Sequence, residues 1–212
     1  MMQVDVDQLS LRDNNMARKS IAAHHNVGTM PPLRALFSFL LATLAVASPA
    51  PLENRQALIT AQTINQDVLN IHAGVQSLRK HVATYDGSLP SETPLVGDFT
   101  AIHLANRKGF ADADLRQTPF TVEESTGIVQ TVIDTVGESI PAAVEETEAK
   151  KALFDKNGQS PIIVGALKVL LDDHDTFSAA VSKSLSADQV RAQAVVAKIH
   201  NAIQSGIDYF SA

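Results

Sequence analysis

Cysteine is absent from this 212-residue chain, so thiolate nucleophiles, zinc knuckles, iron–sulfur ligation and disulfide frameworks are all excluded. Tryptophan is absent as well, and aromatic residues make up only 5% of the sequence. A hydrophobic core must therefore be built mainly from Ala, Val, Ile and Leu, which favours helices over a β-sandwich. With 45% hydrophobic and 19% charged residues, the composition predicts one globular domain.

The chain also lacks an excess of basic residues, because its formal net charge is −6 and no Lys/Arg cluster occurs. A nucleic-acid partner needs such a cluster to displace counterions from phosphates, so we expect no nucleic-acid binding. Motifs of common enzymes are missing too: G-x-S-x-G, H-E-x-x-H, the phosphate-binding P-loop and the dinucleotide fingerprint. The sequence therefore predicts a protein that is not an enzyme and has no cofactor or catalytic residue.

One dense group of metal-ligand types does occur, at Asp172-Asp173-His174-Asp175. On a helix these four side chains fan through about 300°, so they cannot converge on one ion without a second element. His174 falls on an apolar stripe, where a core histidine is expected more often than a metal ligand. We therefore predict no metal site.

A single long apolar run is present, at residues 35–46, and it is too short to span a bilayer. It follows Met30 and Arg34 and ends in Ala45-Val46-Ala47, the small-x-small pattern of signal peptidase sites. We interpret residues 30–47 as a secretory signal peptide; the alternative is a buried core helix. An extracellular protein without a transmembrane segment follows from this interpretation.

The signal peptide divides the chain into four parts. Residues 1–29 are polar and without sustained period, and we interpret them as an extension upstream of the true start at Met30. Residues 48–56 form a flexible leader, and residues 57–212 form the domain.

Apolar residues at alternating steps of four and three predict a first helix over residues 64–85, which ends at Asp86-Gly87. Its stripe is Ile64, Val68, Ile71, Val75, Leu78, Val82 and Tyr85. A loop rich in Ser, Pro and Thr is expected over residues 88–94. A weaker second helix then carries Leu95, Phe99, Ile102, Ala105 and Phe110 and ends before Pro119.

Thr121 and Glu124 have the spacing of a capping box and predict the start of a third helix. Its stripe runs through Val129, Val132, Val136 and Ile140 and continues to Val144, Thr147 and Phe154, before Asn157-Gly158. Pro141 removes one backbone donor inside this stretch, so we expect either a strong kink or a split into two helices there.

Ser160-Pro161 predicts the start of a fourth helix, with Ser160 as its cap. Its stripe is Ile163, Leu167, Leu170, His174, Phe177, Val181 and Ser184. Ser186 and Gln189 form a second candidate capping box before a final helix striped by Ala192, Val196, Ile199, Ile203 and Phe210. Together these patterns predict an all-α fold, an antiparallel bundle of five to six amphipathic helices without disulfides.

Seven of the 10 glycines fall inside the predicted helices, where each costs about 0.5–1 kcal/mol relative to Ala. They are Gly74, Gly97, Gly109, Gly127, Gly137, Gly165 and Gly206. One explanation is close approach of helices at crossings, or tolerance on the solvent side. The other is a bundle whose middle is underfilled and leaves room for an apolar ligand.

The predicted helices also carry a family resemblance. The first reads Asp67-Val-Leu-Asn-Ile, then Val75, Leu78 and Tyr85-Asp-Gly87. The later part reads Ile140, Lys150-Lys151-Ala-Leu-Phe154, Val164, Leu167, Leu170, Phe177 and Leu185. In this spacing the chain resembles, over residues 55–212, the fungal hydrophobic surface-binding protein A family, which includes the cell wall galactomannoproteins. The resemblance implies a helical bundle, secreted or associated with the cell wall, that binds hydrophobic surfaces or encloses fatty acids between its helices.

The leading hypothesis is a non-catalytic protein that binds a fatty acid or another lipid between its helices. Candidate lining residues are Phe99, Ile102, Val129, Val132, Ile133, Val136, Leu167, Leu170, Phe177 and Val181, and candidates for the polar head group are His174 and Ser182. The alternative for each lining residue is ordinary core. One rival is a surface-active protein that spreads on hydrophobic surfaces and recruits a secreted esterase. Another is a cell wall structural antigen or effector without lipid chemistry.

Overall fold

The computed structural model describes residues 59–212. The predicted upstream extension (1–29), signal peptide (30–47) and leader (48–56) lie outside these residues. Over the described part the chain forms seven helices and no strand: α3 Ala61–Thr84, α4 Leu89–Leu115, α5 Val122–Asp134, α6 Val136–Glu148, α7 Lys151–Lys156, α8 Ser160–Ser184 and α9 Gln189–Ser211. The predicted all-α fold is confirmed.

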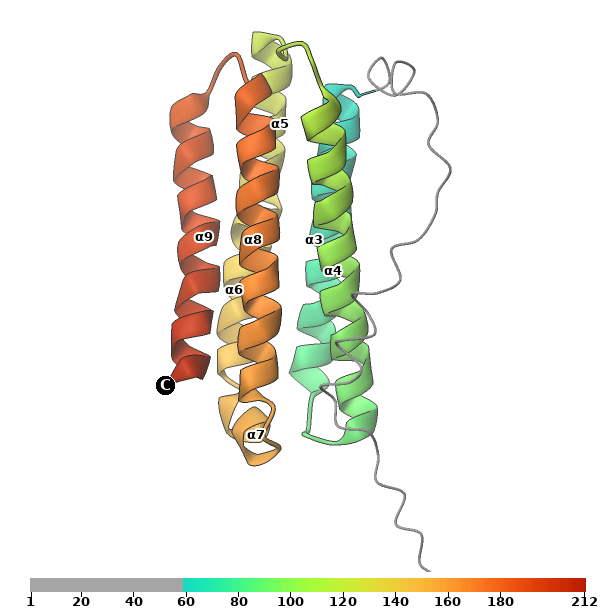
Figure 1. Cartoon of the computed structure of the whole chain (residues 1–212), viewed down its shortest axis with the longest axis vertical. Coiled ribbons are helices and arrows are strands. Elements are labelled where there is room, and N and C mark those ends of the chain that lie inside the picture. Colours follow the sequence, from blue (N-terminus) through green and yellow to red (C-terminus); the bar gives the residue numbers. More distant parts are fainter. Residues whose placement is uncertain (1–58) are drawn as a thin grey trace, which may run out of the picture.

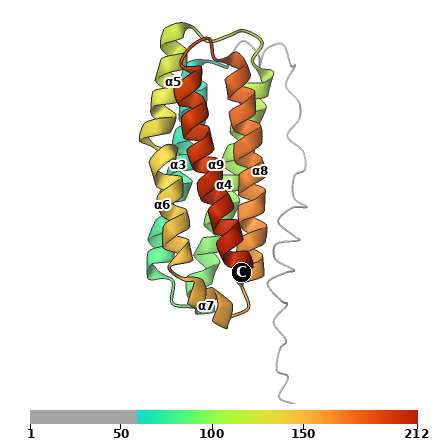
Figure 2. The same ribbon diagram turned by 90° about the vertical axis from the view of Figure 1, so that its left-hand side faces the viewer.

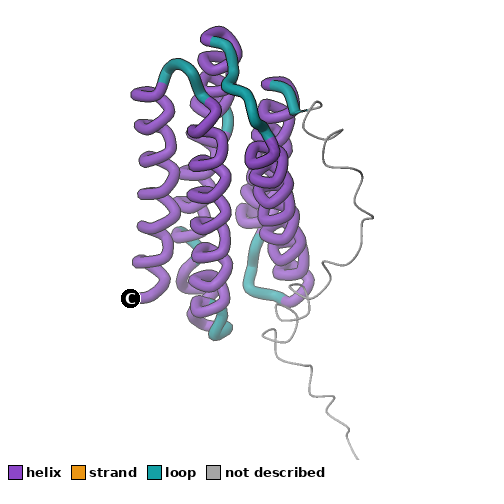
Figure 3. Tube along the Cα trace, turned by 45° about the horizontal axis from the view of Figure 1, so that its top comes forward, coloured by secondary structure: helices purple, strands orange, loops and turns teal. Residues whose placement is uncertain are grey.

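The long helices run up and down beside one another and form a single elongated bundle (Figure 1). Turned by 90°, the bundle shows α5 and α6 following each other as one interrupted rod (Figure 2). Loops are confined to the two ends of the bundle, apart from the interruption between α5 and α6 (Figure 3). The antiparallel arrangement was predicted, and six of the seven helices are long enough to contribute to it.

Helix α3 follows the predicted apolar stripe at every position. All seven stripe residues, from Ile64 to Tyr85, are buried. Thr60 starts the helix, because its Oγ1 accepts a hydrogen bond from the Thr63 amide at 3.2 Å. Gly87 has a φ of +85°, as expected for the glycine that ends this segment.

Helix α4 begins earlier than predicted, and the expected loop over residues 88–94 is wrong. The helix starts at Leu89, so Pro90 stands in the first turn, where the missing amide has no helical partner to lose. Pro94 lies inside the helix. Asp86 stabilises the turn that leads into α4: its Oδ1 accepts hydrogen bonds from the Ser88 amide at 2.9 Å and the Ser91 hydroxyl at 2.7 Å.

The third predicted helix is divided, but not at Pro141. Its capping box is confirmed, since Thr121 Oγ1 accepts from the Glu124 amide and Glu124 accepts from the Thr121 amide. The stretch is divided twice: at Thr135, whose backbone (φ −119°, ψ −90°) leaves the helical region, and between α6 and α7, at residues 149–150. Pro141 stands inside α6 instead. A Cβ on Gly137 would lie 3.0 Å from the carbonyl oxygen of Val132, so this tight passage depends on glycine.

The two later helix starts also differ from the prediction. Ser160 is the first residue of α8 rather than its cap, and its hydroxyl donates to Asp155. The second capping box is wrong, because Asp188, in the left-handed region at φ 63°, precedes α9. Ser186 is held elsewhere: its amide donates to Ser125 Oγ at 3.0 Å. On α9, Val195 is buried and the predicted Val196 is only half-buried.

The helical glycines divide into two groups. A Cβ on Gly74, Gly109, Gly137 or Gly206 would come within 3.0 Å of a side chain on a neighbouring helix: Ile102, Phe177, Val195 and Val144, respectively. Gly97, Gly127 and Gly165 are exposed, and a Cβ there would meet nothing within 4 Å. Close crossings and solvent-side tolerance therefore account for all seven. Among residues 59–212, no helix has the length and apolar character needed to cross a membrane.

Candidate functional site

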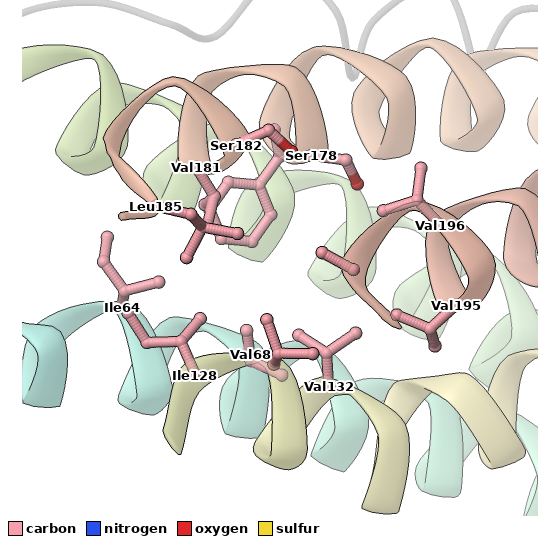
Figure 4. Close-up of a pocket in the computed structure, with 13 residues that line it drawn as sticks. Ile64, Val68, Ile128, Val132, Ser178, Val181, Ser182, Leu185, Val195 and Val196 are labelled. Atoms are coloured by element: carbon pink, nitrogen blue, oxygen red, sulfur yellow. The ribbon is translucent and has the colours of Figure 1, made fainter. Parts of the chain in front are cut away.

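An apolar cavity of about 50 Å³ lies between α3, α5, α8 and α9, in the half of the bundle that contains α5 (Figure 4). We call it the upper cavity. Its lining is Ile64, Val68, Ile128, Val129, Val132, Phe177, Ser178, Val181, Ser182, Leu185, Ala192, Val195 and Val196. The polar side chains in this set are Ser178 and Ser182, both from α8, so any polar contact to a ligand here would come from one wall.

A second cavity, of about 40 Å³, continues along the inside of the bundle toward α7. We call it the lower cavity. Its lining is Val75, Leu78, Phe99, Ile102, Asn106, Ile140, Ala143, Val144, Thr147, Leu167, Leu170, His174 and Ile203. Helices α3, α8 and α9 thus border both cavities, which places the two in line along the bundle.

Most of the predicted lining residues border one of the two cavities. Val129, Val132, Phe177 and Val181 line the upper one, and Phe99, Ile102, Leu167 and Leu170 line the lower one. Ile133 and Val136 line neither; Val136 is buried in the core and Ile133 packs against it. The stripes thus placed the side chains on the inward faces, and packing leaves space beside eight of the ten.

The two predicted head-group residues lie at different cavities. His174 borders the lower cavity and Ser182 the upper one. On α8 they are separated by about 12 Å of helical rise, so they cannot serve one carboxylate together.

His174 is already engaged within the protein. Its Nε2 lies 3.1 Å from the carbonyl oxygen of Val196, which can only accept, so Nε2 carries the proton. Its Nδ1 is then the acceptor, and the Ser178 hydroxyl lies 3.4 Å away. Burial lowers the pKa of His174 below its ordinary value, although the hydrogen bond to Val196 opposes the shift. A neutral, doubly engaged imidazole links α8 to α9.

Sequence reasoning missed several lining residues. Ile64, Val68, Val75 and Leu78 were assigned to the first stripe but not to a site, and the structure places them on the cavity walls. Asn106 also lines the lower cavity, but as a polar residue it is not part of an apolar stripe and could not be identified from one. It is buried, and its Nδ2 donates to the carbonyl of Ile102 at 2.9 Å within the same helix.

The Asp172–Asp175 cluster is dispersed over two interfaces. Asp173 accepts from His103 Nδ1 at 2.6 Å on the α4 side, and Asp175 pairs with His200 of α9 at 2.9 Å. Burial raises the pKa of Asp173, while the hydrogen bond from His103 opposes that shift. No group of three His, Cys, Asp or Glu side chains within residues 59–212 is arranged to hold a metal. These pairs fasten neighbouring helices.

Neither cavity holds an acyl chain in this conformation, because both are much smaller than an apolar cavity of about 150 Å³, which accommodates only a benzene-sized molecule. Their arrangement nevertheless defines a path. From Leu167 to Ser182, α8 borders the two cavities over about 23 Å of helical rise, which exceeds the length of an extended palmitoyl chain. The walls of this path, which we call the central track, are apolar along most of its length.

The bundle and its track can be compared with known proteins. A protein-family model described as hydrophobic surface binding protein A matches residues 61–183. The chain belongs to this family. No curated protein sequence matches it. The family match covers the helices from α3 to nearly the end of α8, and therefore most of both cavities.

Solved structures with the same fold include several ligand complexes. One is Afmp4p in complex with palmitic acid, with a TM-score of 0.68 and 21% identity over 71% of this chain and 99% of that chain. Another is ligand binding domain 1 of the Penicillium marneffei MP1 protein complexed with arachidonic acids, with a TM-score of 0.66 and 22% identity over 72% and 100%. Domain 2 of the same protein, with multiple arachidonic acids, gives 0.64 and 20% over 69% and 92%. At these identities the likeness establishes the shared fold.

Proposed function

We propose that this member of the hydrophobic surface binding protein A family is a non-catalytic, extracellular lipid-binding protein that holds a fatty acyl chain in the central track. The observation that carries the proposal is the alignment of two apolar cavities that share α3, α8 and α9 as walls. The complexes of similarly folded domains with palmitic and arachidonic acids support it. Export through the predicted signal peptide at residues 30–47 is part of the proposal.

Binding requires the track to widen, and α5 is the element proposed to move. The upper cavity separates α5 from α8, and the non-helical Thr135 separates α5 from α6. The described polar ties of α5 toward the α8–α9 side are few: Ser125 with the amide of Ser186, and Gln130 with Arg191. A rigid-body displacement of α5 about Thr135 would therefore open the upper cavity without breaking the long helices.

The energy available from an acyl chain is sufficient for this opening. Each buried methylene contributes about 0.8 kcal/mol, so the roughly 14 methylenes of palmitic acid contribute about 11 kcal/mol in total. Association and helix displacement consume several kcal/mol, which leaves an expected dissociation constant in the micromolar range. The hydroxyl of Ser182 is the proposed partner of the carboxylate, since it borders the upper cavity and the Ser178 hydroxyl already donates to His174.

Filling the upper cavity tests the proposal. Ser182→Phe places a ring in the track and should weaken the binding of palmitic acid at least tenfold, measured by calorimetry on delipidated protein. Ala179→Phe is the matched control, because Ala179 is exposed on the same helix. Unchanged affinity in a folded Ser182→Phe variant would contradict binding in the track. Absence of any saturable fatty-acid binding by the natural protein would contradict the function itself.

A second candidate function is adsorption to hydrophobic surfaces, with recruitment of an esterase as its extension. It is favoured by apolar side chains exposed at one end of the bundle: Val122 at the start of α5 is 66% exposed, and Val190 at the start of α9 is 82% exposed. Adsorption to polystyrene beads that is lost in the Val122→Ser/Val190→Ser double variant, but retained in Ser182→Phe, would support this function. Adsorption that the double variant leaves unchanged would count against it.

A further inference from the structure

A third, smaller cavity lies beyond the lower one, at the end of the bundle that contains α7. We call it the end cavity. It measures about 20 Å³, enough for one oxygen-sized group, and lies between the first half of α4, Phe154 of α7 and the start of α8. Phe99 lines both the lower cavity and the end cavity. The end cavity is therefore one side chain away from the central track.

The end cavity contains a buried carboxyl group, one oxygen of which accepts no hydrogen bond. Glu92, on its wall, is only 5% exposed, and its Oε1 is buried without a hydrogen-bond partner. Gln159, also on the wall, accepts a hydrogen bond from the Tyr85 hydroxyl, and its interaction with Glu92 lowers the pKa of that carboxyl against the larger effect of burial. None of the ion pairs formed by residues 59–212 includes Glu92.

Glu92 lacks the basic partner that each of the other buried acids of the bundle has. Asp173 accepts a hydrogen bond from His103, and Asp67 accepts one from Lys108 at 2.6 Å. Burial raises the pKa of Glu92, and the interaction with Gln159 only partly opposes the shift. A buried acceptor without a partner lowers the stability of the fold. A ligand in the adjacent track that donates a hydrogen bond to this oxygen would remove that cost.

We propose that the end cavity receives a hydroxyl group at the far end of a lipid chain, which donates a hydrogen bond to Glu92 Oε1. The ligand class is therefore a long-chain alcohol or an acyl chain with a terminal hydroxyl, entering past Phe99. This inference rests on the proposed lipid-binding function and specifies its ligand. Glu92 and Gln159 set the specificity at this end of the track.

The same geometry determines which way a fatty acid points. A carboxylate brought to Glu92 would place two acids within hydrogen-bond distance, and one of them would have to be protonated. The carboxylate of a terminally hydroxylated fatty acid is therefore directed away from Glu92, along the track toward the upper cavity. An unsubstituted chain would leave Glu92 Oε1 without a partner.

The test compares two ligands with the same chain and the same carboxylate. Palmitic acid and 16-hydroxypalmitic acid are titrated into delipidated protein by calorimetry. A hydrogen bond to a carboxylate corresponds to a preference of about tenfold or more for the hydroxy acid. Hexadecanol, which lacks the carboxylate, should compete with the hydroxy acid.

Two Glu92 variants and one control locate the preference. Glu92→Leu removes the acceptor and should abolish the discrimination while palmitic acid still binds. Asp98→Leu is the matched control, because Asp98 is a buried acid of the same helix that lines none of the three cavities, and it should leave the discrimination intact. Glu92→Gln retains an amide oxygen and should keep part of the preference; it also serves if the leucine variant does not fold.

The outcomes separate this inference from the function beneath it. If the natural protein binds palmitic acid as tightly as the hydroxy acid, the end-cavity inference is overturned and lipid binding stands. A preference that survives in both folded Glu92 variants would also overturn it. If neither ligand binds, the failure lies with the proposed function.

Discussion

The glycine at the α4–α8 crossing offers a sharp test of how tightly the bundle is packed. In Gly109→Ala, the added Cβ would lie 2.7 Å from Phe177 Cζ and 3.0 Å from its two Cε atoms. The ring is buried and borders the upper cavity, so it must shift or the helices must separate. Overpacking of this kind costs about 1–3 kcal/mol, and the better helix propensity of alanine returns about 0.5–1 kcal/mol. We expect a net loss of roughly 0.5–2 kcal/mol.

Gly97→Ala is the matched control on the same helix. Gly97 is exposed, and a Cβ there would meet nothing within 4 Å, so this variant should gain about 0.5–1 kcal/mol. The free energy of unfolding of both variants is measured by urea denaturation with a common m-value. The two substitutions should therefore shift stability in opposite directions. If Gly109→Ala is as stabilising as Gly97→Ala, the close contact with Phe177 is refuted.

Three further predictions concern caps and titrating groups. Thr121→Ala should lower the free energy of unfolding by about 1 kcal/mol, because it removes the capping box of α5. Thr93→Ala, on the exposed face of α4, should change that free energy little. Equal effects of the two substitutions would contradict a stabilising role for the capping box. His174 should titrate below its ordinary pKa in NMR, and its stabilisation should be complete above pH 6.5 and fall as pH decreases through the folded pKa. Glu92→Gln should raise the free energy of unfolding at pH 7, and this gain should shrink toward pH 4. The reason is that the cost of burying an ionised carboxylate appears as pH rises through the folded pKa of Glu92. A gain that is the same at both pH values would contradict this prediction.

The helices were predictable wherever apolar spacing alone decided them. The spacing of the stripe from Ile64 to Tyr85 is enough to identify the buried face of the helix, and every member is buried as expected. The effect of the prolines on the helices was predicted less accurately, because that effect depends on where the proline stands within the helix. Pro90 falls in a first turn, where it is harmless, and Pro141 is accommodated inside α6, while the interruption occurs at Thr135.

The cavities were predictable only as a set of candidate walls. Phe99 and Phe177 were placed on the correct inward faces, and both border cavities. Val136 shares the same periodicity and is packed solidly instead. Whether an inward side chain meets a neighbour or a space depends on the register between helices, which a single helix does not contain.

The sequence by itself determined the helical class, the inward faces and the need for a core without disulfides, because these follow from composition and from contacts three and four residues apart. Tertiary structure alone decided that four glycines serve close crossings, that the two cavities align, and that Glu92 is buried with one oxygen unpaired beside Gln159. Such features are set by distances between residues far apart in the chain, and a pattern of local spacing carries no information about them.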